Sequence, residues 1–323
     1  MDPPPSEPHG PGISRRRFLA MMGAMAGAGA FALANTQCAP DVLRRVVQGT
    51  RAVAPPQHAV WVWQFSIDGP VAEIAPALAA RNLAVVVKTH DGLDWMATYD
   101  PVPGAVAGAR EAGILARVFE DYGVPFHAWA VVKGIDPVRE AAMAADVLDA
   151  GAHSLTLDLE AHEGFWAGTS DDALRFGEEL RRRNPYGRVD VAIDPRPWQM
   201  LAAPLGEFAT FCDGIRPQLY WDIYDTPDNA NGYAYLGFPP GPAGITPEFL
   251  VDTTRRLLAP FDRWVVPLAL GTARDAAWAR FAHEAWAQGM PALNVWRYGT
   301  AGRALLDYLG ANPPGAEPAG EPG

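Results

Sequence analysis

Residues 125–160 read PFHAWAVVKGIDPVREAAMAADVLDAGAHSLTLDLE and contain a complete strand–helix–strand unit. Apolar, β-branched and aromatic residues at 125–132 and 154–160 predict two strands. Between them, the Ala- and Leu-rich stretch 137–150 predicts an amphipathic helix, and Gly151 follows it where a left-handed stop is favoured. A strand, a helix and a second strand in succession predict a parallel pair covered by a helix.

The same alternation continues from residue 58 to residue 309. Strands are expected at residues 60–66, 83–89, 125–132, 154–160, 189–194, 215–221, 264–270 and 293–298. Helices are expected at residues 71–80, 105–122, 137–150, 171–183, 197–210, 247–258, 273–288 and 301–309. Because a parallel sheet must be covered by helices and closure removes its edges, these units predict an α/β fold, a single (β/α)8 TIM barrel. An open doubly wound sheet is the alternative, although no G-x-G-x-x-G loop follows the first strand.

Composition narrows the class of protein further. The 323 residues are 49% hydrophobic and 20% charged, with a net charge of −11. These values exclude a disordered, collagen-like or disulfide-stapled chain. The acidic chain has no cluster of Lys and Arg, so we expect no nucleic-acid partner. We find no cofactor motif and expect no cofactor.

The N-terminal segment predicts export. Residues 14–34 read SRRRFLAMMGAMAGAGAFALA and resemble a twin-arginine signal, matching S-R-R-x-F-L from the first residue. The resemblance implies the twin-arginine translocation machinery as a partner, cleavage after Ala34 and a periplasmic or extracellular location. No stable membrane span is expected after cleavage, because the apolar run is short and rich in Gly. An uncleaved anchor is the alternative.

The expected domain organisation follows from these segments. Residues 1–34 are the signal peptide, 35–57 a linker, 58–309 the barrel and 310–323 a disordered Pro/Gly/Glu tail. A lipid anchor at Cys38 stays an alternative that the preceding residues fit poorly. No bond is assigned between this cysteine and Cys212, the second of the two.

The fourth strand carries the strongest chemical signal. Side chains alternate along a strand, so Thr156, Asp158 and Glu160 share one face, with the two acidic Cα atoms about 6.6 Å apart. Two carboxylates this close cannot ionise independently, which leaves a proton donor beside an anion. Glycoside hydrolysis requires such a pair. A structural ion pair with Lys88 or Arg196 is one alternative, and metal binding is another.

Other strand ends place polar and aromatic groups toward the same mouth. A glutamine, a tyrosine and a tryptophan platform suit a sugar, whose C–H faces stack on indole and whose hydroxyls need fixed partners. The alternation of side chains along a strand predicts that Lys88 shares a face with His90, and Trp296 with Tyr298. The substrate-binding candidates are Lys88, His90, Trp129, Asp194, Gln218, Tyr220, Trp296 and Tyr298.

Four strand motifs carry a family resemblance. They are VVVKTHDG at 85–92, LTLDLE at 155–160, RPQLYW at 216–221 and NVWRYG at 294–299. With them the chain resembles the lysozyme-type barrels of glycoside hydrolase family 25 and chitinase-like barrels. The first resemblance implies Asp158 and Glu160 as catalytic carboxylates. The second implies Glu160 as the acid and Tyr220 as the tyrosine of the sixth strand.

Three functions are therefore open. The leading hypothesis is an exported glycoside hydrolase that acts on a cell-wall or extracellular polysaccharide, with Glu160 as general acid and Asp158 stabilising the reacting centre. The second is a non-catalytic carbohydrate-binding barrel. The third is a metal-dependent hydrolase using His90, His162 and Asp158, which no H-E-x-x-H pattern supports. The leading hypothesis requires no metal.

Overall fold

The computed structural model describes residues 57–315. The predicted export signal, its cleavage site, Cys38 and all but the last residue of the predicted linker lie outside the described residues, as does the end of the chain from residue 316. Within the described part, no helix combines the length and apolar character needed to cross a bilayer.

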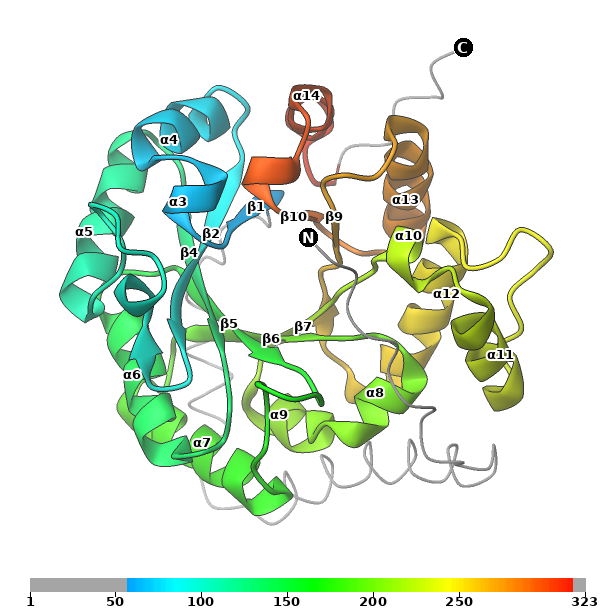
Figure 1. The fold of residues 1–323 in the computed structure, drawn as a ribbon, viewed down its shortest axis with the longest axis horizontal. Coiled ribbons are helices and arrows are strands. Elements are labelled where there is room, and N and C mark those ends of the chain that lie inside the picture. The colour runs from blue at the N-terminus through cyan, green and yellow to red at the C-terminus, as the bar shows by residue number, and fades with distance from the viewer. Residues whose placement is uncertain (1–56, 316–323) are drawn as a thin grey trace.

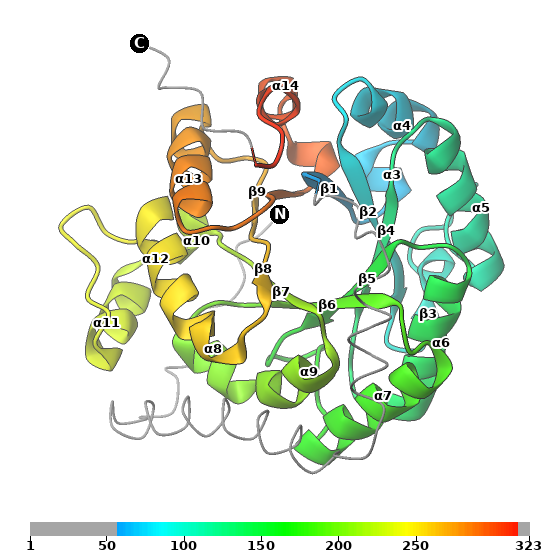
Figure 2. The same ribbon diagram turned by 180° about the vertical axis from the view of Figure 1, so that it is seen from behind.

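Parallel strands form a closed ring (Figure 1). They are β1 (Ala59–Val62), β2 (Ala84–Asp91), β4 (Phe126–Val131), β5 (Ser154–Leu159), β6 (Arg188–Ile193), β7 (Gly214–Pro217), β8 (Trp264–Val265), β9 (Leu268–Leu270) and β10 (Asn294–Trp296). Their order is β8-β7-β6-β5-β4-β2-β1-β10-β9. A parallel bridge between Gln218 and Leu268 joins the end of β7 to β9 and closes the ring. The reverse view shows β8 beside β7 (Figure 2). The predicted (β/α)8 barrel is confirmed.

Helices connect these strands, and the longer ones surround the ring on the outside (Figure 1). They are α3 (Phe65–Asp68), α4 (Val71–Ala79), α5 (Ala109–Asp121), α6 (Pro137–Asp149), α7 (Ser170–Arg183), α8 (Pro197–Ala202), α9 (Leu205–Phe211), α10 (Trp221–Tyr224), α11 (Pro227–Leu236), α12 (Pro247–Leu258), α13 (Asp275–Ala287) and α14 (Arg303–Ala311). In α6, Ala141, Ala144, Ala145 and Leu148 follow helical spacing and are buried. Asp136 caps this helix by accepting a hydrogen bond from the Arg139 amide at 3.1 Å.

The first predicted strand is shorter than expected. It ends at Val62, and Phe65 begins the short helix α3 instead of continuing the strand. Two carboxylates accept the backbone N–H groups at this turn: Asp68 takes that of Trp63 at 2.6 Å, and Asp100 takes that of Phe65 at 2.6 Å. These partners lie outside the apolar run, so its pattern alone did not reveal the turn.

Prolines account for two further differences. The predicted strand 264–270 is divided into β8 and β9 around Pro267, which has no N–H to donate to a ladder. The predicted helix 197–210 is divided into α8 and α9 at Pro204, because proline has no N–H to donate to the preceding turn of a helix.

Three other boundaries are corrected. The predicted helix 105–122 begins only at Ala109. The predicted strand 215–221 ends at Pro217, and Trp221 starts α10. Helix α14 continues to Ala311, so the first two residues of the predicted disordered tail are helical.

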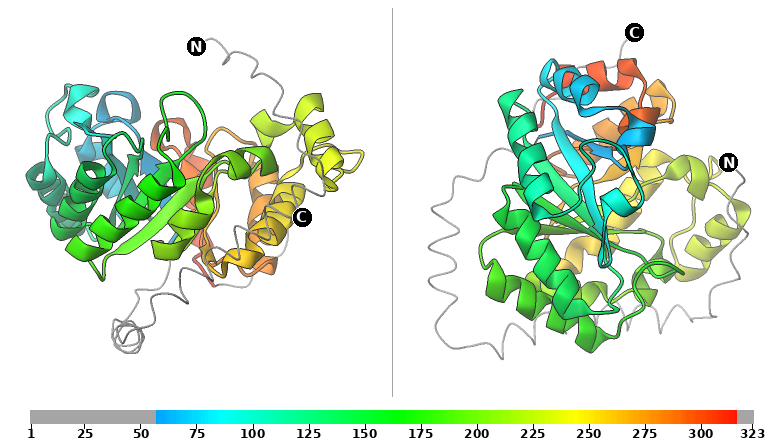
Figure 3. Two further views of the ribbon diagram at one scale, coloured as in Figure 1. Left: turned by 90° about the horizontal axis from the view of Figure 1, so that it is seen from below. Right: turned by 60° about the vertical axis from the view of Figure 1, so that its left-hand side comes forward.

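Two long connections follow the carboxyl ends of strands. The first comes after β2 and contains β3 (Asp94–Trp95), which pairs antiparallel with β2, and the 3-10 helix η1 (Met96–Thr98). The second comes after β7 and carries α10 and α11, which stand out at one side of the barrel (Figure 3). The carboxyl ends of barrel strands are where active sites form.

Candidate active site

Asp158 and Glu160 lie at the carboxyl end of β5. The intervening leucines of this strand, Leu155, Leu157 and Leu159, are fully buried, and the alternate positions face the barrel interior. From the end of β7, the Gln218 amide nitrogen donates to Asp158 Oδ1 at 3.0 Å and to Glu160 Oε1 at 2.9 Å. One amide group therefore links the two carboxyl groups that the sequence places on one strand face.

Burial changes the protonation of both acids. Asp158 is 6% exposed, and its burial together with the neighbouring Glu160 raises its pKa well above the ordinary value. Burial also raises the pKa of Glu160, against the opposing effect of the hydrogen bond from Gln218. Two acids that both resist ionisation at one place retain a proton between them at a pH where ordinary carboxyl groups have lost theirs.

The other Glu160 oxygen has a histidine partner. His162 Nε2 lies 2.5 Å from Glu160 Oε2, and its ring packs edge-on against Phe165 with centroids 4.5 Å apart. His162 entered the sequence analysis only as a metal ligand. Its position two residues beyond Glu160 is the signal that could have linked it to the acid.

Asp194 and Arg196 form an ion pair beside the acids, after β6. The Arg196 Nη2 nitrogen lies 2.6 Å from Asp194 Oδ2, and its guanidinium stands 4.8 Å from the Tyr224 ring centroid. Asp194 also raises the pKa of Glu160, while Arg196 lowers it. The predicted binding residue Asp194 thus lies near the acid pair but is already held by an arginine.

Tyr220 is buried in the same neighbourhood. Burial raises the pKa of its hydroxyl well above the ordinary value, and Asp158, Glu160 and Asp194 raise it further. Its ring lies 6.0 Å from that of Tyr224. The phenol therefore stays protonated, able to donate a hydrogen bond beside the acids.

A bulge in β2 separates Lys88 from His90. The pairing of β2 with β4 shifts between these two residues, so that Lys88 aligns with Trp129 while His90 aligns with Ala130. The prediction that Lys88 and His90 share one face is wrong, because the extra residue reverses the alternation. Asp91, which aligns with Val131, is instead the next residue of β2 in the same alternation as Lys88.

His90 is held by residues of β2 and β3. Thr89 Oγ1 lies 2.9 Å from its Nδ1 atom, and Trp95 packs edge-on against its ring at 5.5 Å. Burial lowers the pKa of His90 to about 3, so the ring is neutral.

Lys88 and Lys133 both bind Asp91. Each ammonium lies 2.6 Å from one of its carboxylate oxygens. Lys88 also stands 4.9 Å from the centroid of the Trp129 ring, and its charge lowers the pKa of Asp158. Lys88 pairs with Asp91 and Arg196 pairs with Asp194, and Gln218 and His162 contact the predicted catalytic acids. Lys133 was not among the sequence candidates.

The tryptophans form a stack within the barrel. Trp129 is buried, donates to the Val62 carbonyl at 3.0 Å, and lies 5.3 Å from Trp61 and 5.4 Å from Trp296. Trp296 is half-buried at the end of β10. Trp129 therefore supports the stack from inside, and Trp296 presents its accessible end.

Tyr298 is placed elsewhere. The prediction that it shares a strand face with Trp296 is wrong, because β10 ends at Trp296 and Tyr298 begins the 3-10 helix η3 (Tyr298–Thr300). The charges that act on its hydroxyl are those of Glu73, Arg81 and Arg303.

An ion pair that the sequence analysis missed links α3 to the segment after β10. Asp68 binds the Arg297 guanidinium and accepts the Gly299 amide at 3.0 Å, while Arg297 stands 5.5 Å from the Trp63 ring. The partners are 229 residues apart in sequence, so no local spacing signals their contact.

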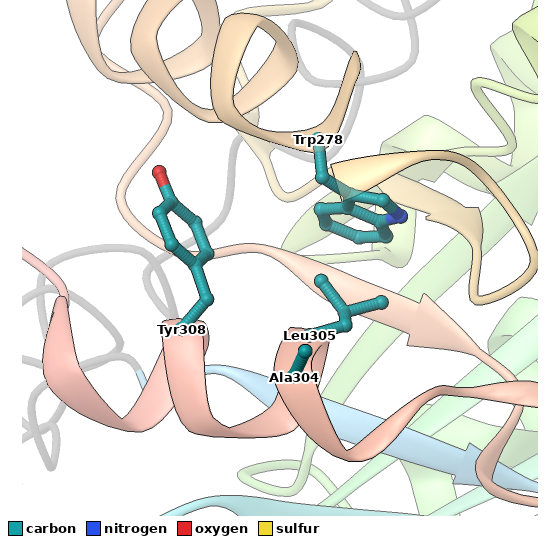
Figure 4. A pocket seen from close by; sticks show the side chains of 4 residues that line it. All are labelled: Trp278, Ala304, Leu305 and Tyr308. Carbon is teal, nitrogen blue, oxygen red and sulfur yellow. The ribbon is translucent and has the colours of Figure 1, made fainter. Parts of the chain in front are cut away.

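Two further kinds of site concern metal ions and small ligands. Within residues 57–315, no group of three or more His, Cys, Asp or Glu side chains is arranged to hold a metal ion. A pocket of about 230 Å³ lies between α13 and α14, lined by Trp278, Ala304, Leu305 and Tyr308 (Figure 4). It has no charged lining and contains none of the predicted site residues.

Comparisons with known proteins extend the fold assignment. No family model matches the chain, and no curated protein matches it. Among solved structures, a glycoside hydrolase family 18 N-acetylglucosaminidase from Paenibacillus barengoltzii is similar, with a TM-score of 0.53 and 12% identity over 78% of this chain and 98% of its own. The second active domain of a Pyrococcus furiosus chitinase has a TM-score of 0.48, with 13% identity over 75% and 84% of the two chains.

Other structural neighbours perform different chemistry. A putative deoxyribose-phosphate aldolase from Toxoplasma gondii ME49 has a TM-score of 0.47, with 14% identity over 85% of this chain and 96% of its own. The neighbours thus include glycoside hydrolases, aldolases and a lyase. At 12% identity, the likeness to the Paenibacillus barengoltzii structure supports the fold alone and leaves the reaction to be argued from the site.

Proposed function

We propose that this protein is an exported glycoside hydrolase that acts on a cell-wall or extracellular polysaccharide. One observation carries the proposal: the Gln218 amide joins two buried carboxyl groups of raised pKa at the carboxyl end of a barrel strand. Glycoside hydrolases use such a pair, one group protonated and one ionised.

Glu160 is the general acid in this proposal. It is more exposed than Asp158, and its raised pKa keeps a proton available for the leaving oxygen of the glycosidic bond. Asp158 lies deeper and supplies negative charge to the oxocarbenium-like centre as the bond breaks. Gln218 holds the two groups at fixed positions.

The short separation of the acids favours retention of configuration. Because one nitrogen contacts Asp158 Oδ1 and Glu160 Oε1 at 3.0 and 2.9 Å, these oxygens are less than about 6 Å apart. Inverting enzymes space their carboxyl groups more widely to admit a water molecule between acid and base. We therefore infer a retaining mechanism.

Trp296 and Tyr220 position the sugar. The half-buried indole offers a flat apolar surface for the C–H face of a sugar ring, supported from beneath by Trp61 and Trp129. The protonated Tyr220 hydroxyl offers a donor beside the reacting carboxyl groups. Export is supported by the twin-arginine motif from Ser14 to Leu19.

Replacing Glu160 tests the proposal. Because the strand motifs resemble lysozyme-type and chitinase-like barrels, the probes are peptidoglycan and chitin oligosaccharides, with products analysed by mass spectrometry. Glu160→Gln keeps the size and the amide contacts but removes the transferable proton, so turnover should fall at least about a hundredfold. Glu163→Gln, at a neighbouring exposed position, is the control.

Two results would change the assignment. Equal turnover by Glu160→Gln and the wild type contradicts the role of this acid. Glycan binding without any product from the wild-type chain would favour the carbohydrate-binding barrel instead.

A further inference from the structure

His162 connects the interior acid with the surface of the protein. Its side chain is 37% exposed, while that of Glu160, 2.5 Å away through Nε2 and Oε2, is 14% exposed. The turn that carries the histidine is held by hydrogen bonds from the Phe165 amide to the His162 carbonyl and from the Trp166 amide to the Glu160 carbonyl, both 3.1 Å. The ring is thus fixed at the position where the acid is nearest to solvent.

Several charged and titratable groups face Glu160 from different elements. Asp158 lies below it on β5, and Asp194 and Arg196 stand beside it after β6. Tyr220 and Tyr224, from the segment after β7, also interact with its charge. Asp194 is paired with Arg196, and burial keeps both tyrosines protonated.

His162 has a combination of properties that none of these groups shares. It contacts the Glu160 carboxyl directly, carries an imidazole that can hold a positive charge, and reaches the solvent. Its cationic form lowers the pKa of Glu160, which opposes the raising effect of burial.

We propose that His162 is a positioning residue, whose ring holds the Glu160 carboxyl group in place both when it donates a proton to the leaving oxygen and when it accepts one from the attacking water. The inference rests on the proposed function and deepens it.

The proton balance is simple. Glu160 gives its proton to the leaving oxygen and becomes a carboxylate. The glycosidic C–O bond breaks, and the sugar carbon is held by the Asp158 carboxylate. In the second step a water oxygen bonds to that carbon, Asp158 is released, and the Glu160 carboxylate takes the proton that the water loses. One water is consumed, His162 gives up no proton, and no oxidation state changes.

The chain contains a matched histidine–glutamate pair for control. His153 Nε2 lies 2.7 Å from Glu120 Oε1, with side-chain exposures of 46% and 42%. His153 precedes β5, at the opposite end of the strand from Glu160, so this pair has the same chemistry without the site. His153→Gln should leave both the pH profile and the turnover unchanged.

The experiment combines an activity profile with a direct titration on the full chain. Wild type, His162→Gln, His162→Ala and His153→Gln are compared on chitin oligosaccharides across pH, and Glu160 is titrated by carbon-13 carboxyl NMR, assigned with Glu160→Gln. In both His162 variants the basic limb and the Glu160 titration should move upward by about one pH unit. The maximal rate should fall about tenfold. Added imidazole should restore part of the maximal rate of His162→Ala.

The two readouts separate the two proposals. An unshifted Glu160 titration in the His162 variants overturns the role of His162, whether or not the protein hydrolyses the probe. A shifted titration in a protein without hydrolysis supports the link between the two residues and overturns the proposed function. A similar shift in His153→Gln would also overturn the assignment, because the effect would not be local.

Discussion

Arg216 and Asp190 form an ion pair inside the barrel. The Arg216 Nη2 and Asp190 Oδ2 atoms are 2.8 Å apart, and the arginine also donates to Asn294 Oδ1 at 2.7 Å. Both charged side chains are almost completely buried. This polar cluster ties β6, β7 and β10 together inside the barrel, and Arg216 stands two residues before Gln218, which links the two acids.

Removing one partner of this pair should destabilise the fold. Arg216→Met leaves Asp190 buried without its cation, and the free energy of unfolding should fall by about 3–5 kcal/mol. The double variant Arg216→Met with Asp190→Leu should recover part of the loss, since no unpaired charge remains. Urea unfolding followed by circular dichroism measures both, and equal stability of wild type and Arg216→Met would contradict the role of the pair.

The same pair predicts a pH dependence of stability. Burial alone would raise the pKa of Asp190, but Arg216 and Arg188 hold it below the ordinary value. A carboxyl group whose pKa is lowered on folding stabilises the protein above its unfolded pKa of about 4, and this contribution is lost as the pH falls through the folded value. In Arg216→Met the pKa of Asp190 should rise, so stability should decrease as the pH increases above about 4. Urea unfolding curves from pH 3 to pH 7 measure how the free energy of unfolding of each protein changes with pH.

Gln218 should control both acids. In Gln218→Leu each carboxylate loses an N–H donor, so the pKa of Glu160 should rise and the basic limb of activity should move to higher pH. Turnover should fall at least about tenfold, because a hydrogen bond to a charged group contributes about 1.5–3 kcal/mol. The control is Gln288→Leu, which removes a similar 3.0 Å contact to Glu284 outside the barrel. Unchanged kinetics in Gln218→Leu would contradict the bridging role.

Gly177 should tolerate no larger residue in α7. A Cβ atom at this position would lie 2.2 Å from the Phe211 ring, which is buried under the helix. Gly177→Ala should therefore lower the free energy of unfolding by about 1–3 kcal/mol, although alanine favours helix. Gly241→Ala, where an added Cβ atom meets nothing within 4 Å, should have little effect. Thermal unfolding of the two variants tests the difference.

The export prediction depends on the arginine pair at Arg15 and Arg16. Replacing both with lysine should stop export and leave the precursor inside the cell, because the translocation machinery reads the arginines specifically. Cell fractionation with immunoblotting measures the location, and mass spectrometry of the exported form checks cleavage after Ala34. Export of the double-lysine variant at the wild-type level would contradict the twin-arginine assignment.

The sequence determined the class of fold and the face of the acid pair. Both follow from local periodicity: apolar runs and helical stretches alternate through the chain, and the period of two along β5 places Asp158 and Glu160 together. Neither inference requires knowledge of distant contacts.

Only the tertiary structure decided which groups hold these acids. Gln218 lies 58 residues beyond Glu160 and reaches it only because the ring closes. A one-residue bulge in β2 breaks the alternation between Lys88 and His90, and β10 ends at Trp296, before Tyr298. Bulges, strand ends and cross-barrel hydrogen bonds depend on neighbouring strands, which the local sequence pattern does not encode.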